Sequence, residues 1–123
     1  LYQVTREAHY AVRDKLRPGT AIKDLCKAGR DVIAHAGYEK HLVFGVGQTG
    51  HGFGLGMHEP PFLLPESEEE LRPGMVLAIE PVILEKPDMH QSMYFTILEN
   101  DYLITEAGYE QLTTTPEEIR IIP

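Results

Sequence analysis

The sequence is poor in several features that would each indicate a class of protein. It has one cysteine, Cys26, so no disulfide can form within the chain, and we expect a reducing, cytoplasmic setting. Basic residues number 11 against 19 acidic ones, and the formal net charge of -8 disfavours nucleic acid or an anionic membrane as a partner. No apolar run approaches the roughly 20 residues that span a membrane. With 42% hydrophobic residues, the chain should be globular.

The first third of the chain has apolar residues at helical spacing. They recur over residues 4–16 and predict a helix that Pro18-Gly19 ends. A second helix is predicted from its N-cap, Thr20, to Ala36, with Gly37 supplying the C-terminal cap. Two helices joined by a short turn form an αα-hairpin.

Strand patterns and glycine-rich segments follow Tyr38. The predicted strands are residues 42–46, 75–79, 93–98, 102–105 and 109–112, the last two joined by a turn at Ala107-Gly108. Six glycines between positions 45 and 56 indicate a backbone that lies close to a ligand or a packed neighbour. Helices first and strands after predict an α+β fold, with the helices on one face of a mostly antiparallel sheet.

Two familiar motifs are present only in part. GVGQTG at residues 45–50 has the spacing G-x-G-x-x-G, but the glycines that follow would not hold the helix of a dinucleotide site. His58-Glu59 begins like H-E-x-x-H, but Pro60-Pro61 follow and position 62 is not histidine. The helical two-histidine zinc site therefore cannot form.

Four side chains stand in settings that indicate a metal site: His51, His58, Glu80 and Glu99. His51 lies between two glycines, and we expect its imidazole to face an open space. Glu80 and Glu99 each end an apolar run, where a buried carboxylate is costly unless it is paired or bound to metal. Histidine and carboxylate ligands without thiolate suit Mn, Fe, Co or Zn.

Three separated motifs occur in a fixed order. They are GHGFGLGMHEPP at residues 50–61, LRPGMVLAIEP at 71–81, and Leu98-Glu99 followed by LITEAGYEQLT at 103–113. Together with LRPG at 16–19 and Gly37-Tyr38, they resemble the methionine aminopeptidase, Xaa-Pro dipeptidase and creatinase superfamily. The resemblance implies a pita-bread fold, in which helices lie on a mostly antiparallel curved sheet, and His-Glu-Pro-Pro favours the Xaa-Pro peptidase members.

The resemblance also implies a role for each of the four side chains. His51, Glu80 and Glu99 match metal ligands, with Glu99 bridging two divalent ions (Mn, Co, Fe or Zn). Glu80 also shuttles a proton and His58 contacts the scissile carbonyl, so both are expected to be catalytic. A metal-bridging hydroxide would cleave the N-terminal peptide bond of a peptide or dipeptide substrate. A homodimer is the expected oligomeric state.

Two aspartate ligands of the family have no counterpart among the aspartates of this chain. They belong upstream of the first predicted helix, and the chain begins at Leu1. Residues 1–123 are therefore expected to be the C-terminal part of a pita-bread catalytic domain, without the part that bears these aspartates. Because Glu80 and Glu99 would balance only half the charge of two divalent cations, the chain alone is expected to bind metal weakly or singly and to have little activity.

The resemblance leaves alternatives open. Substrate-side positions differ from the common Xaa-Pro pattern, with Gly47 in place of histidine, Ile97 of arginine and Asn100 of aspartate. One alternative is other chemistry on the same fold, as in a creatinase-like amidinohydrolase or a lyase, and another is a metal-free binding module. Asn100-Asp101 also reads locally as a turn, but we expect the continuous strand of the family, with a bulge.

Overall fold

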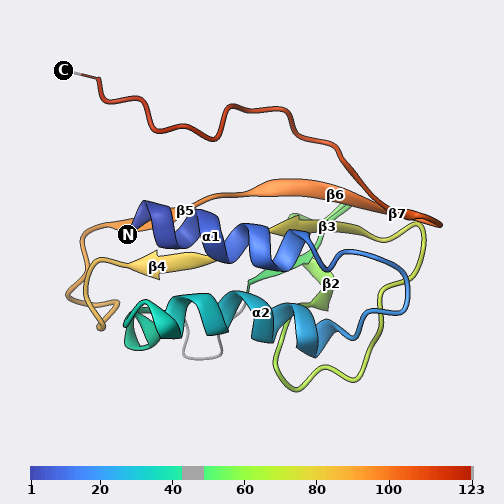
Figure 1. Ribbon diagram of the computed structural model, residues 1–123, viewed down its shortest axis with the longest axis horizontal. Coiled ribbons are helices and arrows are strands. Elements are labelled where there is room, and N and C mark those ends of the chain that lie inside the picture. Colours follow the sequence, from blue (N-terminus) through green and yellow to red (C-terminus); the bar gives the residue numbers. More distant parts are fainter. Residues whose placement is uncertain (43–48, 123) are drawn as a thin grey trace.

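Residues 1–42 and 49–122 are described by the computed structural model, and they form two helices and seven strands (Figure 1). The helices are α1 (Tyr2–Arg13) and α2 (Ile22–His35), and a short 3-10 helix, η1, covers Glu39–His41. The strands are β1 (Gly50–Gly52), β2 (Glu59–Phe62), β3 (Val76–Ile79), β4 (Val82–Leu84), β5 (Phe95–Ile97), β6 (Asn100–Thr105) and β7 (Gly108–Gln111). None of the helices in these two segments has the length and apolar character to cross a membrane.

The two helices run antiparallel and contact each other along their length, as predicted for an αα-hairpin (Figure 1). The first begins and ends earlier than predicted, at Tyr2 and Arg13. The prediction that Thr20 caps α2 is wrong, because Ala21 is the N-cap and the Thr20 hydroxyl donates to the carbonyl of Lys15. A side-chain cap is not needed there, since the N–H of Ile22 already donates to the carbonyl of Glu69.

Gly37 ends α2 as predicted. Its φ of 84° lies in the left-handed region, which glycine adopts without steric cost. The next N–H, of Tyr38, then donates to the carbonyl of Ile33 at 3.0 Å and closes the last turn. The strand predicted at 42–46 falls outside the described residues except for Leu42, which forms an isolated bridge with Ile83. Most of the GVGQTG motif also lies outside them.

The sheet is antiparallel at every pairing among the described strands. Five strands lie in the order β2-β1-β3-β6-β7, and β4 pairs with β5 in a separate two-stranded sheet. The strand of residues 93–98 is shorter than predicted. Asn100 and Asp101 belong to strand β6 and do not form a turn, as the family resemblance led us to expect. The hairpin turn, predicted at Ala107-Gly108, lies one residue earlier at Glu106-Ala107, because Gly108 already pairs with Thr105.

Both predicted glutamate ligands stand where the chain passes between the two sheets. Glu80 lies between β3 of the large sheet and β4 of the small one. Glu99 lies between β5 and β6, where the chain returns. The passage between sheets therefore places both carboxylates at one junction.

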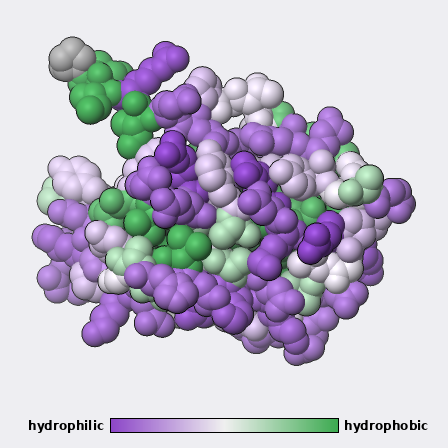
Figure 2. Space-filling view, viewed as in Figure 1, coloured by the Kyte–Doolittle hydropathy of each residue, from purple (hydrophilic) through white to green (hydrophobic). Residues whose placement is uncertain are grey.

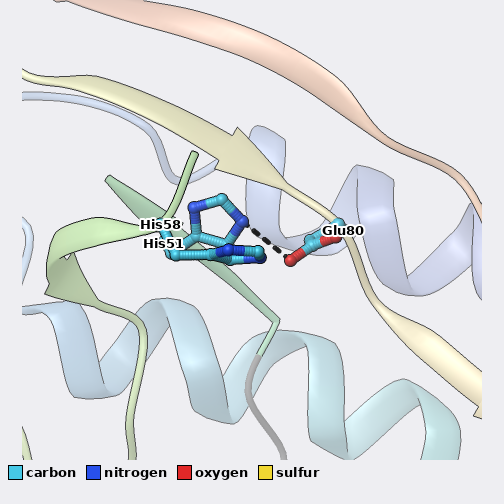
Figure 3. A group of neighbouring side chains, drawn as sticks. All are labelled: His51, His58 and Glu80. Carbon is cyan, nitrogen blue, oxygen red and sulfur yellow. Dashed lines mark ion pairs between the residues drawn. The ribbon is translucent and has the colours of Figure 1, made fainter. Parts of the chain in front are cut away.

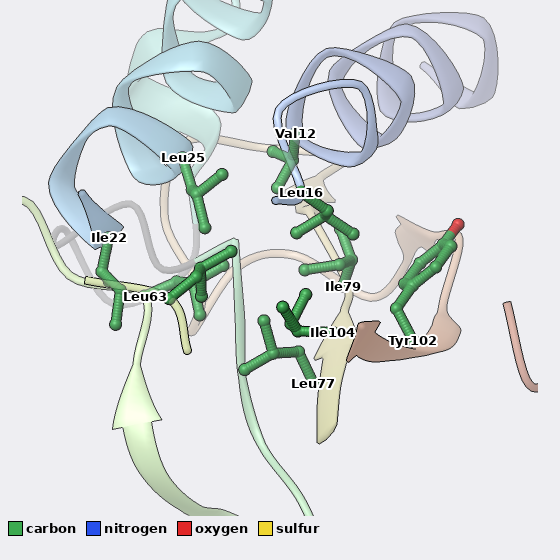
Figure 4. Close-up of a cluster of buried hydrophobic side chains, with 10 residues drawn as sticks. Val12, Leu16, Ile22, Leu25, Leu63, Leu77, Ile79, Tyr102 and Ile104 are labelled. Atoms are coloured by element: carbon green, nitrogen blue, oxygen red, sulfur yellow. The ribbon is translucent and has the colours of Figure 1, made fainter. Parts of the chain in front are cut away.

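Successive side chains of a strand point to opposite faces of the sheet, and one of these two sets faces the helices. Leu77 and Ile79 of β3, with Tyr102 and Ile104 of β6, are at most 1% exposed. They form the main core with residues from the helices and their connections (Figure 4), namely Val12, Leu16, Ile22, Leu25, Leu63 and Leu71. Full burial of a side chain of this size contributes about 1.5–3 kcal/mol, so this layer fixes the helices on one face of the sheet.

The C-terminal segment, which follows β7, is held to the body at Glu117. Its carboxylate accepts hydrogen bonds from the hydroxyl of Tyr10 at 2.5 Å and from the side-chain amide of Asn100 at 2.9 Å. The segment beyond projects from the body and carries exposed apolar groups (Figure 2), Ile121 being 90% exposed. The remainder of the visible face is mostly hydrophilic, in keeping with the net charge of -8.

A buried histidine links α1 to the strand that follows Glu99. His9 is fully buried, and its Nδ1 lies 3.1 Å from the carbonyl oxygen of Leu98. A carbonyl oxygen can only accept, so Nδ1–H donates and Nε2 accepts from the hydroxyl of Tyr102 at 2.8 Å. Burial lowers the pKa of His9, and the hydrogen bond to Leu98 partly opposes that effect.

His9 predicts acid sensitivity of the fold. Because its pKa is lower in the folded state than in the unfolded state, the unfolded chain binds more protons as the pH falls below about 6.5. The free energy of unfolding should then fall between pH 7 and 5. His9→Gln should lower it by about 1–3 kcal/mol at pH 7, since one buried partner is left without a bond, and should flatten its pH dependence. Urea denaturation across this range measures both, with exposed His35→Gln as the control; equal slopes in His9→Gln and wild type would contradict the assignment.

Candidate metal centre

His51 sits in the middle of β1, between two strands that approach closely. A Cβ atom at Gly50 would overlap the carbonyl oxygen of Ala78 on β3, and one at Gly52 would overlap that of Pro60 on β2. The glycines therefore let neighbouring strands approach closely. The sequence had predicted close approach of either a ligand or a packed neighbour, and at Gly50 and Gly52 it is a packed neighbour. The expectation that His51 faces an open space is wrong: flanked by two strands, it is 2% exposed.

The imidazole of His51 is oriented by the backbone. Its Nδ1 lies 2.9 Å from the carbonyl oxygen of Gly52, so Nδ1–H donates there and Nε2 points the other way. Nε2 lies 2.9 Å from a carboxylate oxygen of Glu80 (Figure 3). In the neutral ring this nitrogen carries a lone pair, so two acceptors face each other and need a proton or a cation between them. A histidine that donates its other N–H to a backbone carbonyl is the usual arrangement of a metal ligand.

His58 completes a group of three donors. Its ring centroid is 4.3 Å from that of His51, and ligand atoms of His51, His58 and Glu80 all lie within 4.8 Å of one another (Figure 3). The loop before His58 is held by Glu59, whose carboxylate accepts from the N–H of Gly56 at 3.0 Å. The family resemblance gave His58 only a contact with the substrate's scissile carbonyl. In the structure its ring nitrogen also lies close to the ligand atoms of His51 and Glu80, and the side chain is exposed.

Glu99 stands outside this group. The expectation that it is buried is wrong, because the residue is exposed where the chain crosses between the two sheets. Its carboxyl is nevertheless partly enclosed, and this desolvation, followed by the negative charges of Glu80 and Asp101, raises its pKa. His51 and His58 lower that pKa, so Glu99 shares the electrostatic environment of the three donors.

Asp101 is a neighbour of the site that the sequence reasoning did not find. His51 on β1 and Asp101 on β6 both pair with Ala78 on β3, and residues directly opposite in a sheet share a face. Burial raises the pKa of Asp101 and His51 lowers it. Only the register of strands β1, β3 and β6 places Asp101 beside His51, and the spacing of residues along the sequence does not reveal that register.

A divalent cation fits this arrangement. Two imidazoles and one carboxylate offer nitrogen and oxygen donors at short mutual distances. Negative charge gathers beside these donors, because Glu80 and Asp101 add to desolvation in raising the pKa of Glu99. A bound cation would relieve both this repulsion and the contact between Nε2 of His51 and the carboxylate of Glu80.

Sequence comparison identifies the family. A model of metallopeptidase family M24 matches residues 1–106. The chain belongs to this metallopeptidase family. Similar curated proteins include the Xaa-Pro dipeptidases of Lactobacillus helveticus, 30% identical over 123 residues, and Pyrococcus furiosus, 32% identical over 119 residues. The alignments cover 100% and 97% of this chain but 31% and 32% of those relatives.

Solved structures of the M24 family share the fold. The Xaa-Pro dipeptidase from Bacillus anthracis has a TM-score of 0.85 at 30% identity, covering 98% of this chain and 32% of that chain. Dipeptidase PepE from Mycobacterium ulcerans has a TM-score of 0.83 at 32% identity, covering 96% and 30%. The predicted family and the predicted α+β, pita-bread fold are thereby confirmed.

Proposed function

We propose that this chain carries part of the active site of a metal-dependent peptidase of the Xaa-Pro dipeptidase type, which cleaves an N-terminal peptide bond. One observation carries the proposal: Nε2 of the buried His51, oriented by the Gly52 carbonyl, lies 2.9 Å from a carboxylate oxygen of Glu80. The family match and the names of the similar proteins support it.

His51, Glu80 and Glu99 are proposed as the side chains that would hold the divalent metal. Mn, Co, Fe and Zn all suit such a donor set. Two divalent cations would need more negative charge than Glu80 and Glu99 supply. The chain spans about 30% of the length of its curated relatives, and we propose that the remaining ligands come from a part of the protein outside it. This chain alone should bind metal weakly or singly.

Two of these side chains are proposed to act on the substrate directly. His58 is exposed beside His51, where its ring can donate a hydrogen bond to the scissile carbonyl oxygen as negative charge develops there. Glu80 accepts a proton from the attacking water at its carboxylate and delivers it to the leaving amine. The chemistry that a bound divalent cation supplies is Lewis acidity, which makes water more acidic and polarises the carbonyl.

Hydrolysis assays on the full-length protein test the proposal. Xaa-Pro dipeptides should be cleaved after loading with Mn, Co, Fe or Zn, and a chelator should abolish cleavage until metal is restored. Glu80→Gln should lower kcat by about 10²–10⁴-fold, the range for a positioned acid-base group, whereas the exposed Glu106→Gln should leave it unchanged. Cleavage of creatine but of no peptide, or inertness of the metal-loaded protein toward every dipeptide, would contradict the proposal.

A further inference from the structure

A buried asparagine directly follows Glu99 in the chain. Asn100 is 1% exposed, its side-chain amide donates to the carboxylate of Glu117 at 2.9 Å, and its side-chain carbonyl accepts from the hydroxyl of Thr113 at 2.8 Å. An ionised carboxylate only accepts, so the amide nitrogen must face Glu117. Burying an amide is unfavourable unless its polar groups are bonded, and here the C-terminal segment supplies both partners. The residue after a proposed metal ligand is therefore tied to that segment.

Glu117 is itself held by the first helix. The segment after β7 runs back along the sheet toward the start of α1 (Figure 1), where the hydroxyl of Tyr2 donates to the backbone carbonyl of Glu117 at 2.6 Å. The hydroxyl of Tyr10 donates to the carboxylate at 2.5 Å, and this hydrogen bond is the main cause of the raised pKa of Tyr10. One carboxylate oxygen of Glu117 thus faces α1 and the other faces Asn100. Hydrogen bonds to a charged group are stronger than those between neutral groups, so this connection is firm.

The residue before Glu99 is fixed from α1 as well. The buried ring of His9 donates to the carbonyl oxygen of Leu98 at 3.1 Å. Glu99 therefore lies between two residues whose polar groups are bonded to α1, one directly and one through Glu117. Its own side chain is exposed, so the backbone on either side determines where the carboxylate points. A metal ligand keeps a productive direction only when the groups that support it are fixed.

We propose that Asn100 and Glu117 are positioning residues, and that their hydrogen bond makes the C-terminal segment hold Glu99 in the direction that metal binding requires. The proposal rests on the proposed function, which assigns Glu99 to the metal. The two residue types fit each other, because the amide of Asn100 donates to Glu117 whereas a carboxylate at position 100 would face a second carboxylate. Like charges in contact repel, so that change would push the residue after Glu99 away from its support.

The test titrates the metal-free full-length protein with Mn²⁺ by isothermal titration calorimetry. Asn100→Asp should weaken Mn²⁺ binding by about tenfold or more, as expected for an outer partner of a metal ligand. The direction is informative, because an added carboxylate beside a cation site would by itself tighten binding. Glu117→Ala, at a position outside the sheet, should also weaken binding by about tenfold. With an Xaa-Pro dipeptide, both variants should lower kcat and leave KM unchanged, since they act through Glu99.

Exchanging the pair separates this contact from general damage to the fold. In the double variant Asn100→Asp/Glu117→Gln the donor and the acceptor change places, so the amide at position 117 can donate to the carboxylate at position 100. We expect the Mn²⁺ affinity to recover to within about threefold of the wild type, because the effects of a coupled pair do not add. Tyr2→Phe is the matched control: it removes the other hydrogen bond of Glu117 to α1, at the backbone carbonyl, and should leave the affinity unchanged.

The two proposals fail in different ways. If the wild type binds Mn²⁺ and cleaves an Xaa-Pro dipeptide, while Asn100→Asp and Glu117→Ala bind the ion at least as tightly, the positioning role is overturned and the peptidase remains. Failure of the double variant to recover also overturns it, because the loss in Asn100→Asp would then not come from the contact with Glu117. If the wild type neither binds metal nor cleaves any dipeptide, the proposed function fails, and the positioning role fails with it.

Discussion

Replacing His51 with alanine should lower the affinity for divalent metal by about 100-fold or more, since even outer partners of a ligand contribute 10–100-fold. His51 supplies the nitrogen whose orientation the Gly52 carbonyl fixes and which already lies 2.9 Å from Glu80. Without it, two of the three clustered donors remain, and one of them, His58, is exposed. Isothermal titration with Mn, Co or Zn measures the loss, and the peptidase activity of the full-length protein should fall in parallel.

The matched control for this variant is His35→Ala. His35 is the last residue of α2 and is exposed, so its removal should change neither metal affinity nor activity. Circular dichroism must show that His51→Ala keeps the fold, because the side chain is buried. Equal metal affinities for His51→Ala and the wild type would contradict the assignment of His51 as a ligand.

Gly50→Ala should destabilise the fold by about 3 kcal/mol or more, at the upper end of the cost of overpacking. The added methyl group would overlap the carbonyl oxygen of Ala78, a backbone atom that cannot rotate away. Relief would require β1 to move away from β3, and β1 also bonds to the N–H of Leu63 through the Gly50 carbonyl. Such a loss is a large share of the about 5–15 kcal/mol that stabilises a typical domain.

Urea denaturation followed by circular dichroism measures this effect, with Gly54→Ala as the control. There the nearest group to an added Cβ is the carboxylate of Glu59, a side-chain group that can shift if it gives up its hydrogen bond from the Gly56 N–H, so the cost should be smaller, about 0.5–1.5 kcal/mol. Because His51 follows Gly50 directly, Gly50→Ala should also weaken metal binding. Similar stability of the two variants would show that the separation of β1 and β3 is not set by Gly50.

The structure brings three of the four predicted side chains together, His51, His58 and Glu80, and the roles assigned to all four stay predictions. His51 and Glu80 meet as expected of joint ligands, and His58 lies closer to them than the sequence suggested. Glu99 is exposed rather than buried, and its raised pKa comes from desolvation of the carboxyl group and from Glu80 and Asp101. Burial of one side chain depends on strands distant in sequence, so apolar neighbours along the chain were a poor guide to it. Metal identity, a homodimer and the cytoplasmic setting stay predictions.

Local chemistry determined the elements of the fold. The apolar spacing of residues 4–16 and 20–36 requires two amphipathic helices, Gly37 closes the second, and the apolar run that ends at Ile79 makes a buried strand. These features depend on residues close in sequence, and the periods of helix and strand reveal them. The cap of α2 was missed because its partner, the Glu69 carbonyl, comes from a segment about 47 residues away.

The sequence alone determined which residue types could bind metal and in which order they occur: His51, His58, Glu80 and Glu99. Only the tertiary structure decided how they meet. The antiparallel register places His51, Ala78 and Asp101 in one row, and the passage between two sheets brings Glu80 and Glu99 to one junction. The physical reason is that strand pairing and the direction of the imidazole depend on backbone hydrogen bonds between distant segments, which the order of residues does not specify by itself.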